Sequence, residues 1–176
     1  MATPGIRPAT AADLVVVQEI YATEVRQQTA SFEIEAPSLA VIQARWLAVT
    51  EMGLPYVVAE CDGRIAGYAY AAPYRTRQAY CHTLEDSVYV ARWARRRGVG
   101  SYLLKTLVSE CNLWGARQMI AIIGDPLVHQ GSVALHQKAG FRRVGVLVGV
   151  GHKFDRWLDS LILQRPLGRG VTSPPS

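Results

Sequence analysis

The feature that most constrains the fold of this chain is a Gly-x-Gly sequence near its middle, at Gly98 and Gly100. A segment typical of a β-strand, Asp86–Val90, precedes it, and a segment with the apolar spacing of an α-helix follows it. A helix N-terminus presents unpaired N–H groups and a partial positive charge. Glycines at that point let a ligand approach the backbone closely. We therefore expect a mixed α/β protein with a pyrophosphate-binding helix.

Basic residues gather around the same loop. The chain holds 19 Lys and Arg against 14 Asp and Glu, which gives a net charge of +5 at pH 7. Residues 87–109 alone contribute that excess and contain no acidic residue; their basic residues are Arg92, Arg95, Arg96, Arg97 and Lys105. The positive charge is therefore one patch. A patch of this kind favours an anionic partner, either a phosphate-bearing ligand or a nucleic acid.

The spacing of residues excludes several kinds of site. The Gly-x4-Gly-Lys-Ser/Thr sequence of a Walker loop is absent, and the third glycine of a Rossmann fingerprint is missing. The cysteines Cys61, Cys81 and Cys111 are odd in number and far apart, which argues against a disulfide framework and a Cys-x-x-Cys metal site. We expect reduced thiols and no metal.

The periodicity predicts four helices and six strands in one domain over residues 1–167, followed by a flexible tail over 168–176. Thr10 with Asp13 resembles a capping box that opens the first helix, and Ser38 caps the second. The third helix follows Gly98, and the fourth covers Gly131–Ala139. The predicted strands are Tyr56–Glu60, Arg64–Ala71, Tyr80–Val90, Gln118–Ile123, Phe141–Val148 and Trp157–Gln164.

No targeting or membrane segment is visible in the sequence. The first residues lack the apolar region of a signal peptide, and no apolar run approaches the roughly 18 residues that span a bilayer. We expect a soluble cytoplasmic protein with no membrane partner.

The loop resembles a known signature. Arg95-Arg96-Arg97-Gly98-Val99-Gly100 is similar to the Gln/Arg-x-x-Gly-x-Gly/Ala sequence of GNAT-superfamily acetyltransferases, which holds the pyrophosphate of acetyl-CoA. Other segments resemble one branch, the phosphinothricin and methionine sulfoximine/sulfone N-acetyltransferases, over about residues 5–167. They are Thr29–Glu33, Gly67–Tyr70, Glu85–Val90, Val133–His136 with Gly140-Phe141, and Lys153–Trp157. The resemblance implies the GNAT fold, a mixed central sheet with helices on both faces.

The resemblance also implies a cofactor site for acetyl-CoA. The family has Asn-x-x-Ser before a Leu-His pair, and here His129 stands three residues before Ser132 in place of the asparagine. Imidazole can replace an amide as a hydrogen-bond donor. The residues implied for the cofactor are Val88, Tyr89, Val90, Arg95, Arg96, Arg97, Gly98, Val99, Gly100, Ser101, His129 and Ser132.

Two residues are candidates for the chemistry. Transfer to an amine needs a base for the attacking nitrogen and an acid for the leaving thiolate. Glu85, at the strand before the loop, resembles the family's general base, because a carboxylate can take the proton and burial would raise its pKa toward neutrality. His136 is the second candidate. The alternatives are a charged strand edge for Glu85 and a core histidine bonded to a backbone carbonyl for His136.

The acceptor site is implied by a second group of residues. Tyr74, Arg75 and Arg77 resemble the segment that meets the amino-acid substrate, since guanidinium groups suit a carboxylate or a phosphinate oxygen. Phe32 and Tyr89 are candidate walls of the pocket. Surface exposure for the arginines and core packing for the aromatic residues are the alternatives.

We therefore expect an acetyl-CoA-dependent N-acetyltransferase that acts on the α-amine of a small amino acid or analogue. The alternative is a GNAT enzyme for protein N-termini, lysine or another small amine. A nucleic-acid-binding module is remote, because only Trp93 lies within the Arg92–Arg97 cluster and such modules need several aromatic platforms. We also expect a homodimer, since the apolar residues Leu161, Ile162 and Leu163 need cover.

Overall fold

A single mixed sheet organises the chain in this computed structural model, which describes residues 3–174. Its order is β1-β2-β3-β4-β5-β7-β6, and only β4 and β5 run parallel. The strands are β1 (Gly5–Pro8), β2 (Tyr56–Cys61), β3 (Arg64–Pro73), β4 (Thr83–Val90), β5 (Gln118–Gly124), β6 (Arg142–Lys153) and β7 (Arg156–Pro166).

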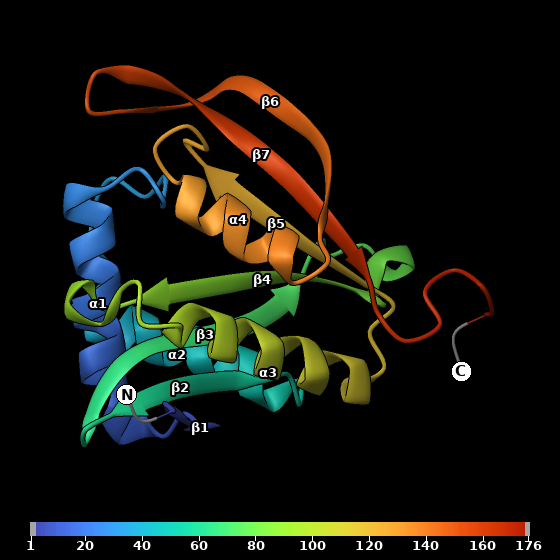
Figure 1. Ribbon diagram of the computed structural model, residues 1–176, viewed down its shortest axis with the longest axis horizontal. Helices are drawn as coiled ribbons and strands as arrows, with labels where there is room; N and C mark the ends of the chain where they lie inside the picture. Colours follow the sequence, from blue (N-terminus) through green and yellow to red (C-terminus); the bar gives the residue numbers. More distant parts are fainter. Residues whose placement is uncertain (1–2, 175–176) are drawn as a thin grey trace.

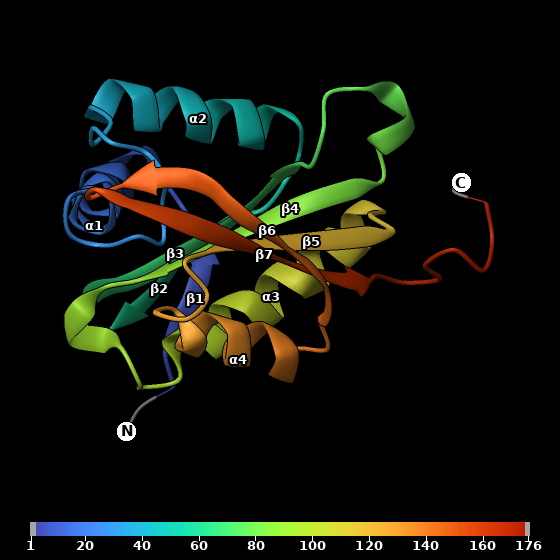
Figure 2. The same cartoon turned by 90° about the horizontal axis from the view of Figure 1, so that it is seen from above.

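Four α-helices cover the two faces of this sheet. Helices α1 (Leu14–Gln27) and α2 (Leu39–Glu51) lie on one face, and α3 (Val99–Trp114) and α4 (Gln130–Lys138) lie on the other (Figures 1 and 2). The predicted capping box before α1 is confirmed, with Thr10 N–H donating to Asp13 Oδ2 over 2.7 Å. Ser38 caps α2 as expected. None of the helices in residues 3–174 is both long and apolar enough to cross a bilayer.

The parallel strands β4 and β5 separate partway along their length. They pair only over Thr83–Asp86 with Gln118–Ala121. Beyond that point β4 continues to Val90 beside β3, and β5 continues to Gly124 beside β7. The sheet therefore opens on one side of β4, and backbone groups of residues 87–90 lose their neighbour on that side.

Alternation along β4 sends neighbouring side chains to opposite faces. Tyr89 meets Tyr21 of α1 at a ring distance of 5.1 Å, so its face is that of α1 and α2. Asp86 bonds to His136 of α4, so its face is that of α3 and α4. Glu85 shares the first face with Tyr89, because the two are four residues apart.

The structure differs from the predicted elements in three places. The strand β1 is additional; it is short and begins only a few residues from the start of the chain, so periodicity could not identify it. The third predicted strand begins at Thr83 rather than at Tyr80, because Gln78–Tyr80 form one turn of 3-10 helix. The last hairpin is longer than predicted, and irregular register between Leu147 and Gly151 lets β6 continue past its glycines.

The predicted tail makes contacts of its own. Arg117 donates to the carbonyl of Gly170 over 3.4 Å and to that of Pro174 over 2.6 Å. Residues 168–174 are therefore held against the domain, and the last two residues of the predicted tail, Pro175 and Ser176, lie outside the described residues.

Gly67 on β3 lies where this strand packs closely against β4 and α3. A Cβ atom on Gly67 would lie 2.6 Å from the carbonyl oxygen of Tyr89 and 3.2 Å from Leu103. We expect Gly67→Ala to lower the free energy of unfolding by about 1–3 kcal/mol, because backbone and a buried helix must move apart. The measurement is urea unfolding. Gly145→Ala is the matched control, since nothing lies within 4 Å of its added Cβ. Equal midpoints for the two variants would contradict the expectation.

Candidate active site

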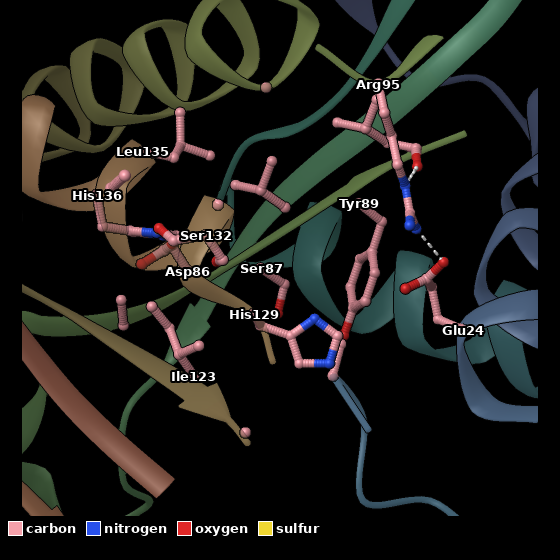
Figure 3. A pocket seen from close by; sticks show the side chains of 18 of the residues that line it. Glu24, Asp86, Ser87, Tyr89, Arg95, Ile123, His129, Ser132, Leu135 and His136 are labelled. Carbon is pink, nitrogen blue, oxygen red and sulfur yellow. Dashed lines mark hydrogen bonds and ion pairs between the residues drawn. The ribbon is translucent and has the colours of Figure 1, made fainter. Parts of the chain in front are cut away.

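A cleft of about 730 Å³ lies where β4 and β5 separate. Residues of β4, of the loop before α3, of the end of β5 and of α4 line it. Figure 3 shows its arrangement, with Arg95 and Glu24 toward one side, Asp86 and His136 toward the other, and Tyr89 and His129 between them. The predicted residues that line it are Phe32, Glu85, Val88, Tyr89, Val90, Arg95, Arg96, Gly98, Val99, Gly100, Ser101, His129, Ser132 and His136.

A row of free backbone amides marks one part of the cleft. The N–H groups of residues 96–100 donate to no acceptor among residues 3–174, although the next amide, that of Ser101, bonds to the carbonyl of Gly98. Gly98 caps α3 in the left-handed conformation with φ of 82°. Five consecutive unpaired donors at a helix N-terminus fit a pyrophosphate. No group of three or more His, Cys, Asp or Glu side chains in the described chain could hold a metal.

Gly100 also lies at a close approach of three elements. A Cβ atom at this position would lie 3.3 Å from Leu135 and 3.5 Å from Val90. The missing side chain therefore lets α3 approach α4 and β4, in addition to clearing the backbone for a ligand.

The three arginines before Gly98 have different places. The Arg95 side chain, which is 41% exposed, reaches back to α1, where it forms an ion pair with the buried carboxylate of Glu24, and its Nε donates to the carbonyl of Val90 over 3.3 Å. Arg95 therefore anchors the loop to α1 and β4 (Figure 3). Arg96 and Arg97 are both exposed, and Arg96 lines the cleft whereas Arg97 does not.

Glu85 lies on the wall of the cleft and is partly buried. Burial raises the pKa of its carboxyl group, and the neighbouring charge of Asp86 raises it further, while Arg75 opposes the shift. A carboxylate with a raised pKa can accept a proton near neutral pH.

His136 is buried beside Asp86. Its Nε2 lies 2.8 Å from Asp86 Oδ2, and its Nδ1 lies 2.8 Å from the carbonyl oxygen of Ser132. Burial lowers the pKa of the imidazole, but the hydrogen bond and charge of Asp86 outweigh burial, so the pKa is raised. His136 thus matches the alternative of a histidine bonded to a backbone carbonyl, with a carboxylate as its second partner.

His129 is held by a hydrogen-bond network at the N-terminus of α4. Thr29 Oγ1 donates to Asp125 Oδ2 over 2.8 Å, and Arg156 donates to the same oxygen over 2.7 Å. Thr29 Oγ1 also lies 3.1 Å from His129 Nε2. Because the hydroxyl gives its only proton to the carboxylate, Nε2 must donate to Oγ1. Burial lowers the pKa of His129, so Nδ1 remains an acceptor.

Phe32 lies between two glycines at the open end of the sheet. A Cβ atom on Gly124 would lie 2.7 Å from its ring, and one on Gly151 would lie 2.4 Å from it. The buried ammonium group of Lys153 donates to the carbonyl of Ser31 over 2.7 Å and fixes the segment that carries Phe32. Phe32 therefore packs against β5 and β6 while its edge lines the cleft.

The other predicted acceptor residues are less closely placed. Tyr89 lines the cleft with a ring stacked on Tyr68 at 5.2 Å. Tyr74 and Arg75 contact each other, with the guanidinium 4.6 Å from the ring centre, but neither is a lining residue. Arg77 is exposed in the loop before the 3-10 turn. Arg77 therefore lies on the surface, which is the alternative that we gave for the two arginines.

Four residues of the site escaped sequence reasoning. Glu24 follows Val17, Ile20 and Tyr21 on the buried face of α1. A carboxylate on the apolar face of a predicted helix could have marked it as a candidate site residue. Asp125, Lys153 and Asp86 carried weaker signals, because their partners are far away in the sequence.

Comparison with known proteins agrees with this geometry. The family model described as an acetyltransferase (GNAT) domain matches residues 6–162. The chain is 49% identical over 163 residues to a phosphinothricin N-acetyltransferase of Alcaligenes faecalis, covering 93% of this chain and 82% of that protein. It is 34% identical to an L-methionine sulfoximine/L-methionine sulfone acetyltransferase of Pseudomonas paraeruginosa, covering 97% of this chain and 98% of that protein.

A solved structure is similar throughout. The phosphinothricin acetyltransferase of Sinorhizobium meliloti in complex with acetyl-CoA is 43% identical with a TM-score of 0.96, covering 99% of this chain and 94% of that chain. The expected fold and the resemblance carried by the Arg95–Gly100 loop are thus confirmed, and the chain belongs to the GNAT acetyltransferases.

Proposed function

We propose that this protein is an acetyl-CoA-dependent N-acetyltransferase that acetylates the α-amine of a small amino acid or analogue of the phosphinothricin or methionine sulfoximine/sulfone type. The observation that carries the proposal is the row of free amides at residues 96–100, which lies in the same cleft as a carboxylate with a raised pKa. A phosphate-bearing cosubstrate needs the free amides, and an amine that must lose a proton needs the carboxylate.

The cofactor would lie along the opening between β4 and β5. The amides of residues 96–100 would receive its pyrophosphate, with Arg96 beside them. The unpaired side of β4 beyond Asp86 offers backbone groups to the amides of the pantetheine arm. His129 offers Nδ1 as an acceptor for an N–H of that arm rather than as a donor. Acetyl-CoA supplies the thioester when bound.

The acceptor would enter from the face of α1 and α2. Glu85 and Tyr89 lie on that face of β4, and Phe32 closes the end near β5 and β6. Arg75 is the cation that acts on the Glu85 carboxyl, and its place beside Tyr74 suits a role at the mouth of the site. A rigid aromatic wall favours a compact acceptor over a protein N-terminus or a lysine side chain.

Glu85 is the general base in this mechanism. The α-amine is protonated near neutral pH, and the attacking nitrogen must also lose a proton as the amide forms. The raised pKa places the carboxyl group closer to neutrality, which is where a general base is most effective. The tightly held loop and cleft walls position the two substrates for direct attack.

The test of the function is a thiol-release assay with acetyl-CoA and a panel of acceptors. Phosphinothricin, methionine sulfoximine and methionine sulfone are expected to support release, and a peptide N-terminus or free lysine to support little. Gly151→Ala should raise the acceptor KM roughly tenfold or more, because its Cβ displaces Phe32, and leave the acetyl-CoA KM unchanged. Gly145→Ala is the control. Release with the peptide alone would favour the alternative enzyme class.

Glu85→Gln separates base catalysis from binding. We expect kcat to fall by about 10²–10⁴-fold with little change in the dissociation constant of acetyl-CoA. The wild-type rate should rise with pH as the Glu85 carboxyl ionises, and this acidic limb should vanish in the variant. Glu110→Gln, on the exposed side of α3, is the matched control. A fully active Glu85→Gln enzyme with an unchanged acidic limb would remove the base assignment.

We also propose a homodimer, although not through the residues first expected. Leu161 and Leu163 are fully buried within the chain, so they need no cover from a partner, and Ile162 is partly buried. One group of exposed apolar residues lies instead on β6, the outermost strand, and on the facing end of β7; its members are Val144, Val146, Leu147, Val148, Val150 and Trp157. A long apolar edge strand pairs readily with a second copy.

Light scattering tests the dimer. The mass at micromolar concentration should be that of two chains, and Val148→Lys should lower it toward one, because a charge on an edge strand opposes pairing. Val171→Lys is the control, since Val171 is exposed far from β6 in sequence. A single-chain mass for the wild type would contradict the proposal.

Three free cysteines support a cytoplasmic location, and we propose neither a membrane nor a nucleic acid as partner.

A further inference from the structure

A buried carboxylate on α1 is tied to the loop that carries the free amides. Glu24 lines the cleft, and its side chain is 6% exposed. Its ion-pair partner is Arg95, the residue just before the free amides of residues 96–100 (Figure 3). No other cation in residues 3–174 pairs with Glu24. The carboxylate of Glu24 is thus the point where the first helix holds the loop proposed for the pyrophosphate.

The charge of Glu24 does not suit a cleft for an anion. Burial lowers the pKa of His129, and the charges of Asp125 and Glu24 oppose that shift, so the charge of Glu24 reaches into the cleft. A buried charge is also screened less by salt than an exposed one. By charge alone, the cleft would bind a pyrophosphate more tightly without Glu24. A carboxylate at this place therefore needs another reason.

The bonds of Arg95 supply that reason. Its Nη2 donates to Glu24, and its Nε donates to the carbonyl of Val90, at the end of β4, over 3.3 Å. Two of its nitrogens thus join α1 to β4 across the loop, and a buried partner neutralises its charge. Only Nη1 forms no bond among residues 3–174. A planar guanidinium held at two points fixes the backbone at residue 95.

The next residue shows why this backbone needs an anchor. Arg96 has φ of 61°, in the left-handed region that a residue with a side chain seldom adopts, and Gly98 follows with φ of 82°. A residue other than glycine stays in that region only where its surroundings hold it there. These dihedral angles set the direction of the free N–H groups. Arg96 and Arg97 form no hydrogen bond or ion pair through their side chains in the described chain, so the side chain of Arg95 is the one that holds the loop.

We propose that Glu24 is a positioning residue that sets the affinity for acetyl-CoA through Arg95. Glu24 holds the loop so that the free amides meet the pyrophosphate, and Arg95 is the anchor of the loop rather than a ligand of the phosphates. This inference rests on the proposed function, because it takes the pyrophosphate to lie on these amides. It leaves Arg96, which lines the cleft, as the cation of the loop that is free to meet the cofactor.

One substitution distinguishes an anchor from a phosphate ligand, because the two roles predict changes of opposite sign. If Arg95 holds the loop, Glu24→Gln loosens the loop and weakens acetyl-CoA binding. If Arg95 contacts the phosphates itself, Glu24→Gln frees its guanidinium and removes a repelling charge, so acetyl-CoA binds more tightly. Gln keeps the size of the side chain, and Arg95 is 41% exposed, so water can meet its guanidinium and we expect the variant to fold.

Calorimetric titration of the full chain with acetyl-CoA tests the sign. We expect Glu24→Gln to raise the dissociation constant about tenfold, which is the cost of ordering one or two loop side chains on binding. Arg95→Gln should raise it by a similar factor, and the double variant by no more than either, because all three remove one contact. Glu19→Gln, on the exposed side of α1, is the matched control. Tighter or unchanged binding by Glu24→Gln, or losses that multiply in the double variant, would overturn the inference.

A shortened thioester separates the loop from the rest of the cleft. S-Acetylpantetheine carries the thioester and the pantetheine arm but no pyrophosphate. In the thiol-release assay, Glu24→Gln should raise the KM for acetyl-CoA about tenfold, with kcat for acetyl-CoA and kcat/KM for S-acetylpantetheine within about twofold of the wild type. An equal loss with both thioesters would mean that Glu24 supports the whole cleft, and would overturn the inference. Absence of transfer with every acceptor would refute the proposed function, and the titration would still decide the role of Glu24.

Discussion

The separation of β4 from β5 is the constraint on which the rest of the molecule depends. The two strands pair for only four residues each and then diverge, which leaves half of β4 without a neighbour on its β5 side, although β3 still pairs with its other side. Unpaired backbone groups inside a protein are costly unless a ligand or water meets them. The opening therefore creates the cleft and supplies its donors and acceptors at once. The free amides before α3 extend the same row of unpaired groups around the end of the strand.

Keeping such an opening requires anchors on both sides. On the α1 side, Glu24 is buried and would be uncompensated without Arg95, so the loop before α3 is tied to the first helix. On the β6 side, the Lys153 ammonium reaches the carbonyl of Ser31, and Phe32 fills the gap between Gly124 and Gly151. Each anchor joins segments far apart in sequence. A buried charge that loses its partner costs several kcal/mol, roughly 3–5, so these contacts hold the cleft's shape firmly.

Local patterns predicted the elements and the loop, but not the long-range partners. The glycines of the loop, the capping box at Thr10 and the turn at Gly115 act within a few residues, so their roles can be deduced from the sequence. The ion pair of Arg95 with Glu24 could not, because the two residues lie 71 positions apart. The same holds for His136, whose carboxylate partner lies 50 residues away. The acceptor segment was carried by resemblance alone, and the structure leaves Arg75 and Arg77 outside the lining of the cleft.

The period of two along β4 sends adjacent carboxylates to opposite faces of the sheet. Glu85 and Asp86 differ by one position, yet one faces the helices α1 and α2 and the other faces α4. A slip of one residue in the pairing of β4 with β3 would exchange their faces and place Glu85 on the side of His136. The register Ala72 with Glu85 and Ala71 with Asp86 therefore matters for chemistry as well as for stability. The same register puts Tyr68 against Tyr89, whose stacked rings leave no room for a shift. Packing of aromatic rings on one face thus secures which carboxylate faces α1 and α2 and which bonds to the histidine.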